Sequence, residues 1–203
     1  MARTRVVETK RELIIESALR LILRKGYDGT TVDDVAAAAG VSKGLVSYHF
    51  AKKDALFKAV LEKILAKLES DLEEMSRQDL PARERLRLNF RNLFENAERT
   101  RSYYTVLVDF LAQAPREALV RSYTQTIYQT ILRSVEATIR DGIAAGEFRQ
   151  VDPRMAASTV VALTEGFVFQ WLYNPEGIDL GEAYEVSDQL LAEFLVIGPP
   201  PGL

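Results

Sequence analysis

The chain has 203 residues, of which 47% are hydrophobic and 27% charged, so it is long enough to bury a substantial core and polar enough to stay in solution. It contains no cysteine, which excludes disulfides and thiolate metal sites, and its one histidine, His49, leaves no second imidazole for a metal pair. The net charge is −3, but residues 1–53 carry 10 Lys+Arg against 6 Asp+Glu, whereas residues 54–203 carry 16 against 23.

The charge difference indicates a basic module joined to an acidic body, although an ordinary fluctuation in composition would produce the same numbers. No run approaches the length of about 20 apolar residues that spans a membrane. The start, MARTRVVETKRE, lacks the apolar segment of a signal peptide. We therefore expect a cytoplasmic protein without a membrane partner.

Apolar residues recur with the 3.6-residue period of a helix along nearly the whole chain. Glycine often ends a helix and proline suits its first turn, so Gly26, Pro81 and Asp152-Pro153 mark expected boundaries. Helices are expected at approximately residues 14–25, 32–39, 43–49, 54–75, 81–97, 103–113, 120–139, 153–173 and 180–196. There is no convincing period-two alternation and no internal repeat. The sequence therefore predicts an all-α fold with about nine helices.

The stretch TTVDDVAAAAGVSKGLVSYHF, residues 30–50, contains the strongest local signals. Thr30 and Thr31 precede Asp33 and Asp34, which is the Thr-x-x-Asp spacing of a helix N-cap with acidic residues in the first turn. The alanines that follow are small enough for a second helix to approach closely. Gly40 suits a tight turn, and Ser42 can cap the next short helix. Two short helices joined at a glycine predict a helix-turn-helix.

The two faces of this pair of helices differ in chemistry. The positions expected to point inward are Val35, Ala39, Val41 and Val46. The outer face consists of Ser42, Lys43, Gly44, Ser47, Tyr48 and His49. It has no carboxylate, and such a helix can enter a major groove. Lys52 and Lys53 follow at the start of the next helix, where they can neutralise phosphates. The alternative is a helical hairpin buried in a larger bundle.

His49 would need partners to act in catalysis or metal binding. The chain has no cysteine and no second histidine, and we find no glycine-rich phosphate loop and no carboxylates at metal-ligand spacing. Two interpretations of His49 stay open: it donates to a DNA phosphate, or it is a half-buried packing residue. The sequence thus predicts no catalytic site, no metal site and no cofactor, and a protein that is not an enzyme.

The run GYDGTTVDDVAAAAGVSKGLVSYHFAKKDALF resembles the DNA-binding signature of the TetR family of transcriptional repressors. The resemblance covers about residues 10–60 and departs at Ser47, where the family more often has tyrosine. It implies contacts to DNA bases or backbone, with Thr31 meeting a phosphate. The residues implied are Thr31, Lys43, Gly44, Tyr48, His49 and Lys53.

The family plan implies a three-helix DNA-binding domain, here residues 1–53, followed by a helical domain that dimerises and often holds an inducer, here residues 54–203. The body is loosely similar to the betaine-regulator type of repressor in FLAQAPREALV, IRDGIAAGEFR and VALTEGF. We expect a homodimer that reads a palindromic double-stranded operator, with half-sites about one helical turn apart, and that a small-molecule inducer releases. The alternative is a DNA-binding regulator without a small ligand, whose body serves dimerisation or a protein partner.

The last two predicted helices are expected to form the dimer interface as a four-helix bundle across a two-fold axis. Val160, Leu163, Phe167, Gln170 and Trp171 share a face of the first helix, and Val186, Leu190, Phe194 and Ile197 line the second. The alternative is that these faces pack only within one protomer.

An aromatic cluster in the body is a candidate inducer pocket, because aromatic walls with a few polar groups suit small-molecule sites. The candidate ligand-binding residues are Tyr103, Leu107, Phe110, Tyr123, Ile127, Tyr128, Phe167 and Trp171. Asp109 or Glu165, if buried, would suit a cationic or hydroxylated inducer. An ordinary aromatic core would have the same pattern; the family plan favours the pocket.

Overall fold

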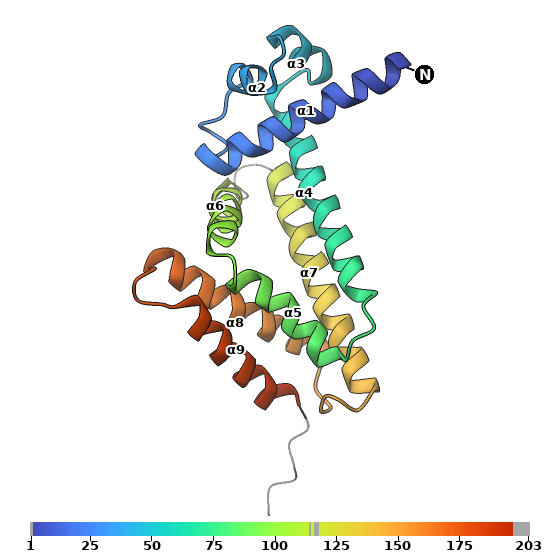
Figure 1. The fold of residues 1–203 in the computed structure, drawn as a ribbon, viewed down its shortest axis with the longest axis vertical. Coiled ribbons are helices and arrows are strands. Elements are labelled where there is room, and N and C mark those ends of the chain that lie inside the picture. Colours follow the sequence, from blue (N-terminus) through green and yellow to red (C-terminus); the bar gives the residue numbers. More distant parts are fainter. Residues whose placement is uncertain (1, 114, 116–117, 197–203) are drawn as a thin grey trace, which may run out of the picture. The chain divides into compact units, whose positions relative to one another are not determined.

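The computed structural model describes the backbone of residues 2–113, 115 and 118–196, and the side chains of these residues except 2–8, 109, 110, 113 and 119. Within this part the chain forms nine helices and no strand, which confirms the expected all-α fold (Figure 1). The helices are α1 (Ala2–Lys25), α2 (Val32–Ala39), α3 (Lys43–His49), α4 (Lys53–Ser76), α5 (Ala82–Phe94), α6 (Ala97–Gln113), α7 (Ala118–Ala144), α8 (Pro153–Tyr173) and α9 (Leu180–Leu195). An isolated antiparallel bridge joins Phe148 to Val196.

Local capping signals set several of the helix ends. α1 is followed by Gly26, whose φ of 76° lies in the left-handed region that favours glycine. α8 begins at Pro153, after Asp152, whose carboxylate accepts a hydrogen bond from the Arg154 amide at 2.9 Å. Asp179 caps α9 in the same way. The predicted starts of these last two helices are therefore confirmed.

The boundary between α5 and α6 differs from the predicted pair of helices, one through Ala97 and the next from Tyr103. α5 ends at Phe94, and α6 already begins at Ala97. Asn96 explains the break, because its side-chain oxygen accepts a hydrogen bond from the Arg99 amide at 2.9 Å and so caps α6. Between Phe94 and Tyr103 the one apolar residue is Ala97, which is exposed, so the period of apolar residues could not locate the break.

The first compact unit, called the head here, comprises the described residues of Met1–Leu68 and Ser102–Gln125. Its apolar core joins α1, α2 and α3 to the first half of α4 and extends to Val106 and Val120. Almost completely buried members of this core are Ile14, Val35, Val46 and Val60. The core therefore includes residues beyond the range 1–53 predicted for the DNA-binding domain, and that boundary stays a prediction.

The second compact unit, called the body here, comprises the described residues of Glu69–Arg101 and Thr126–Leu203. Within it α9 packs against α5 and α8, as Figure 1 shows in red, green and orange. Phe148 is 2% exposed and lies against Gly142 of α7, where a Cβ atom would come within 2.2 Å of the Phe148 ring. This close approach leaves no room for a side chain at position 142, which explains the glycine there.

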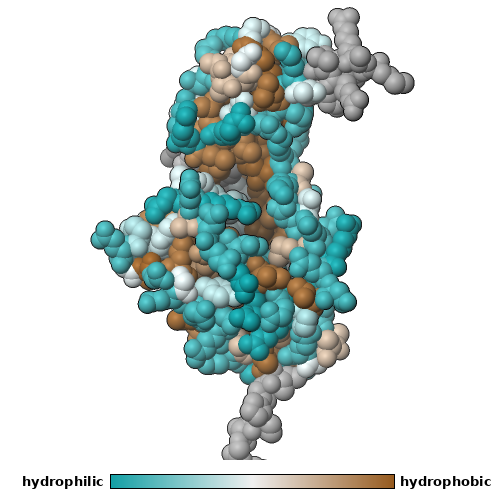
Figure 2. Space-filling model, viewed as in Figure 1, coloured by the Kyte–Doolittle hydropathy of each residue, from teal (hydrophilic) through white to brown (hydrophobic). Residues whose placement is uncertain are grey.

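α8 is long and apolar enough to cross a membrane, by length and composition alone, which corrects the expectation that no segment has this character. The core helix of a protein that spans no membrane can have the same length and apolar composition, so a single such helix is weak evidence for a membrane span. Val160 and Val168 are fully buried, and the buried Thr164 donates its hydroxyl proton to the Val160 carbonyl at 2.9 Å. These residues make α8 part of the body core. Figure 2 shows hydrophilic and apolar side chains interspersed on the visible face of the body.

Candidate nucleic-acid interface

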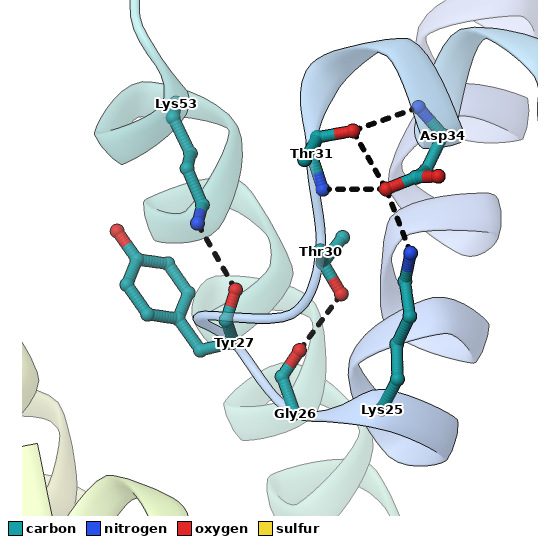
Figure 3. Close-up of polar contacts among 7 residues, drawn as sticks. All are labelled: Lys25, Gly26, Tyr27, Thr30, Thr31, Asp34 and Lys53. Atoms are coloured by element: carbon teal, nitrogen blue, oxygen red, sulfur yellow. Dashed lines mark hydrogen bonds and ion pairs between the residues drawn. The ribbon is translucent and has the colours of Figure 1, made fainter.

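The start of α2 is held by a capping box. The Thr31 hydroxyl accepts a hydrogen bond from the Asp34 amide at 3.1 Å, and the Asp34 carboxylate accepts one from the Thr31 amide at 2.9 Å (Figure 3). Lys25 of α1 pairs with the same carboxylate at 2.7 Å. The hydrogen bond from the Lys25 ammonium holds the pKa of Asp34 well below its usual value, and the hydrogen bonds from Thr31 lower it further. The predicted cap is confirmed, and Lys25 adds a link between α1 and α2 that was not predicted.

The turn between α2 and α3 has the expected geometry. Gly40 has a φ of 62°, in the left-handed region, and the Ser42 hydroxyl oxygen accepts a hydrogen bond from the Leu45 amide at 3.2 Å to cap α3. The residues expected to point inward are Val35, Ala39 and Val46, which are buried, and Val41, which is half-buried against the same core. The head therefore contains the predicted helix-turn-helix.

The opposite face of α3 is open to solvent. Ser42, Lys43, Gly44, Ser47 and Tyr48 are exposed, and Tyr48 reaches 77%. A Cβ atom on Gly44 would meet only the Ser42 hydroxyl oxygen, at 3.9 Å, so packing within the chain does not require glycine there. An exposed aromatic and small polar surface on the second helix of a helix-turn-helix is suited to contact with base edges.

His49, also on α3, is half-buried rather than exposed. Its ring centroid lies 5.3 Å from that of Tyr48 in an edge-to-face arrangement. Its Nε2 atom is covered and has no hydrogen-bond partner among the described residues. The packing interpretation of His49 agrees with this geometry, whereas a phosphate contact through Nε2 would require the ring to turn outward.

Two lysines of this surface already have partners in the chain. Lys43 lies 3.0 Å from an Asp33 carboxylate oxygen, between exposed side chains. The Lys53 ammonium donates to the Tyr27 carbonyl at 3.0 Å and lies 4.1 Å from the centroid of the Tyr27 ring (Figure 3). Its neighbour Lys52 is exposed. The predicted phosphate contacts thus include one half-buried lysine, Lys53, that also holds the turn after α1.

Tyr27 and Asp33 were not predicted to matter for this surface. Both lie inside the signature stretch, but their partners are 26 and 10 residues away along the chain. The spacing of residues within a helix predicts contacts three or four positions apart. It does not predict a contact between two elements, so this spacing could not place Tyr27 beside Lys53 or Asp33 beside Lys43.

The predicted ligand residues divide between the two units. Tyr103, Leu107 and Tyr123 belong to the head, and Ile127, Tyr128, Phe167 and Trp171 to the body. The side chains of Phe110 and Asp109 lie outside the described part of the chain. A small hollow in the body is lined by other residues, among them Leu86, Phe90, Phe148 and Leu191. None of the predicted ligand residues lines it.

A polar pair lies among the body members of this set. The Tyr128 hydroxyl of α7 donates to the Glu165 carboxylate of α8, which is half-buried. Burial raises the pKa of Glu165, and the hydrogen bond from Tyr128 opposes that rise. Trp171 lies on the same helix as Glu165, and its ring centroid is 4.6 Å from the guanidinium carbon of Arg101 on α6. The body therefore contains a half-buried carboxylate bonded to Tyr128 and a buried aromatic ring faced by Arg101.

Two family models match the chain. Residues 14–60 match the model described as bacterial regulatory proteins, tetR family. Residues 82–196 match the model described as BetI-type transcriptional repressor, C-terminal. The second match alone covers more than half of the 203 residues.

The chain belongs to the TetR family. Among curated relatives, the HTH-type transcriptional regulator YhgD of Bacillus subtilis is 28% identical over 163 residues, 80% of this chain and 84% of the relative. The HTH-type transcriptional regulator BetI of Burkholderia mallei is 28% identical over 195 residues, 91% of this chain and 95% of the relative. This TetR-family member is a DNA-binding transcriptional regulator and not an enzyme, as the sequence predicted.

Solved structures share the fold of this TetR-family chain. A putative transcriptional regulator from Saccharomonospora viridis, in complex with choline, superposes with a TM-score of 0.85 at 23% identity and covers 94% of this chain and all of its own. FadR from Bacillus subtilis, in complex with stearoyl-CoA, has a TM-score of 0.68 at 22% identity, covering 89% of this chain and 96% of its own. At these identities the likeness establishes the fold alone.

Proposed function

We propose that this regulator is a homodimeric repressor that binds a palindromic operator through α3 and leaves it when a small cationic inducer binds the body. The observation that carries the proposal is the exposed outer face of α3, from Ser42 to Tyr48, on a helix-turn-helix capped at both helices. Such a helix fits the major groove, with its N-terminal residues at the base edges. The regulator would act in the cytoplasm, where its operator lies.

The proposed DNA contacts are Thr31, Ser42, Lys43, Gly44, Ser47, Tyr48, His49 and Lys53. Of these, Thr31 has a particular requirement, because its hydroxyl proton is donated to Asp34 at 2.6 Å. The hydroxyl has one proton, so a phosphate contact through it requires that bond to exchange. The Thr31 hydroxyl therefore contributes less than the exposed side chains of α3.

Selection of bound sequences from a random duplex library tests DNA recognition. We expect enrichment of an imperfect palindrome whose half-sites are about one helical turn apart. Tyr48→Ala should change the preferred sequence if Tyr48 touches bases, each lost base contact costing about 1–3 kcal/mol of discrimination. Recovery of no sequence above the random background, at low ionic strength, would contradict the proposal.

The proposed dimer interface uses the exposed side of α9 and the neighbouring part of α8. Val186, Leu190 and Phe194 lie four residues apart and are 46%, 44% and 37% exposed, which makes an apolar stripe on one side of the helix. Leu163 and Phe167 of α8 are half-buried.

Two residues expected at the interface pack inside the protomer. Val160 is fully buried and Trp171 only 6% exposed, so both support the packing of the body and do not belong to the pairing surface. Gln170 is exposed, and Ile197 lies outside the described residues. The proposed surface is therefore smaller than the predicted one and centres on α9.

The proposed inducer site includes Tyr128 and Glu165 in the body, with Phe167 and Trp171 on the same helix as Glu165. Burial destabilises the charged form of Glu165 and so raises its pKa. A cation bound beside this carboxylate would stabilise the charged form, and that interaction would favour binding of a cationic ligand. Aromatic rings also attract quaternary ammonium groups. Choline, which is bound in the structural neighbour from Saccharomonospora viridis, is therefore the first probe to use.

Binding would act by population shift. An inducer that prefers a state in which the two heads no longer match the operator lowers DNA occupancy in proportion to its preference. Couplings of this kind are about 1–3 kcal/mol, or roughly 5- to 150-fold in affinity. The mechanism requires no change in the head residues that contact DNA.

Fluorescence of Trp171, the chain's one tryptophan, gives a direct readout of ligand binding in the body. Choline should change this fluorescence, raise the melting temperature and release a selected operator. If choline and stearoyl-CoA both leave fluorescence, melting and operator binding unchanged, the second candidate is favoured, a regulator whose body serves only dimerisation or a protein partner.

A further inference from the structure

Asp33 of α2 forms an ion pair with Lys43, the one lysine of α3. Its carboxylate lies 3.0 Å from the Lys43 ammonium, and the two side chains are 67% and 64% exposed. The adjacent Asp34 does not face Lys43, because its carboxylate accepts a hydrogen bond from the Thr31 amide and pairs with Lys25. The outer face of α3 has no carboxylate of its own, so Asp33 brings a negative charge to it from α2.

A phosphate that approaches Lys43 must share this ammonium with Asp33 or displace it. In either case two anions come close to one cation, and the unfavourable interaction between them reduces the gain from the contact. A lysine already paired with a carboxylate also contributes less to the release of counterions, which supplies most of sequence-independent DNA affinity. The cost applies to every duplex, because phosphates carry no sequence information.

We propose that Asp33 competes with DNA phosphate for Lys43 and thereby lowers the affinity of this regulator for duplexes of any sequence. The larger share of the remaining affinity then comes from base contacts, so Asp33 is a specificity-determining residue that itself touches no base. This inference rests on the proposed function in one respect, which is that Lys43 contacts DNA.

A double-mutant cycle on the full-length chain tests the competition. The affinity of a fluorescein-labelled random-sequence duplex is measured by anisotropy between 50 and 200 mM salt for the parent, Asp33→Asn, Lys43→Gln and the double variant. Asp33→Asn should bind about two- to fivefold tighter per subunit, the range expected for an exposed charge pair. Its slope of log affinity against log salt should steepen by up to about 1 per subunit. In the Lys43→Gln background, Asp33→Asn should have no effect.

Asp28→Asn is the matched control. Asp28 is exposed in the turn before α2, and its removal changes the net charge equally without touching Lys43. It should change affinity much less than Asp33→Asn. Equal effects of the two variants would mean that net charge alone is responsible and would overturn the proposal.

The remaining outcomes separate the inference from the proposed function. If Lys43→Gln leaves affinity unchanged, Lys43 does not contact DNA, and both the contact and the competition fail. If Lys43→Gln weakens binding while Asp33→Asn does not strengthen it, the competition alone is wrong. Far-UV circular dichroism and thermal unfolding of each variant exclude a change in folding as the cause. Competition with a selected operator should show a smaller ratio of specific to random affinity for Asp33→Asn than for the parent.

Discussion

Lys53 has a structural contact within the head and is also a proposed DNA contact. Its ammonium has three N–H donors, and one of them is given to the Tyr27 carbonyl while the charge lies over the Tyr27 ring. Tyr27 in turn donates its hydroxyl proton to Asp54 at 3.3 Å. The start of α4 is thereby tied to the turn after α1. Two of the three donors remain, so a contact with phosphate would not require the bond to Tyr27 to break.

Lys53→Ala and Lys52→Ala distinguish these roles. Lys53→Ala should lower the free energy of unfolding by about 1–2 kcal/mol, because it removes a charged hydrogen bond and a cation–π contact. It should also lower the salt slope of DNA affinity by about 1 per subunit and weaken all sequences alike. Lys52→Ala, at an exposed position, should change stability by less than about 0.5 kcal/mol. Urea unfolding and salt titrations measure both quantities. An unchanged slope for Lys53→Ala would leave Lys53 with the structural role only.

Glu165 should reduce stability near neutral pH. Its pKa is raised above the usual 4.5 in the folded chain by burial, so the folded state binds the proton more tightly than the unfolded chain does. Stability therefore falls as the pH rises from 4.5 through the raised pKa, and is recovered on acidification through the same interval.

Glu165→Gln keeps an acceptor for Tyr128 but removes the charge. It should raise the free energy of unfolding at pH 7, and the difference from the parent should shrink as the pH approaches 4.5. The same variant should lose the response of Trp171 fluorescence to choline. Thermal melts across pH 4.5–8 provide the test, and a difference that is independent of pH would show that the carboxylate is not responsible.

At the scale of helices, the end of an element depends on polar groups that can lie far away in the chain. α5 follows Pro81, which provides no side-chain cap. Its first two amides, of Ala82 and Arg83, instead donate to the two carboxylate oxygens of Glu147, both at 3.1 Å. A carboxylate at this end also interacts favourably with the helix dipole. Glu147 thus supplies from 64 to 65 residues away the cap that the local sequence lacks.

Removal of this distant cap should destabilise the body. Glu147→Ala should lower the free energy of unfolding by about 0.5–2 kcal/mol, the range for loss of an N-cap. Glu147→Gln, which retains acceptors, should cost less. Glu176→Ala, in the exposed turn between α8 and α9, removes the same charge at a residue that caps neither helix, and it serves as the control. Chemical unfolding of the three variants gives the comparison, and equal losses for Glu147→Ala and Glu176→Ala would contradict the assignment.

At the scale of the whole molecule, a single protomer leaves the apolar stripe of α9 exposed to solvent. Val186, Leu190 and Phe194 are exposed at a spacing of four residues on one side of the helix, and apolar patches of this kind mark interaction sites. Pairing of this surface with itself across a two-fold axis would cover it in both protomers. Two heads are also what a palindromic operator requires.

Leu190→Glu tests the pairing surface. Burial of an unpaired carboxylate in an apolar contact should weaken dimerisation by roughly 3 kcal/mol or more, about a hundredfold or more in the dissociation constant. Leu80→Glu is the control, since Leu80 is 40% exposed, close to the 44% of Leu190, and lies outside α9. Sedimentation velocity over a range of concentrations should show dissociation for Leu190→Glu only. A dimer of unchanged strength in that variant would place the interface elsewhere.

Much of the architecture could be predicted because its signals are local. The helical period, the Thr31–Asp34 box, the left-handed Gly40 and the Ser42 cap each involve residues within four positions of one another, and side chains at that spacing meet wherever a helix forms. The helix-turn-helix and the exposed side of α3 follow from these signals. That is why the helix-turn-helix could be recognised from its order of residues.

The contacts that modify the site could not be predicted in this way. Asp33 with Lys43, Tyr27 with Lys53 and Tyr128 with Glu165 join separate elements across 10, 26 and 37 residues. Such pairs form only when the helices pack at a particular distance and rotation, and that packing is decided jointly by many apolar side chains in the cores. For the same reason Val160 and Trp171, placed on an outer face by their period, are buried within the body. The apolar period of one helix predicts which residues share a face. Which other helix covers that face depends on how the whole chain buries its apolar surface from water.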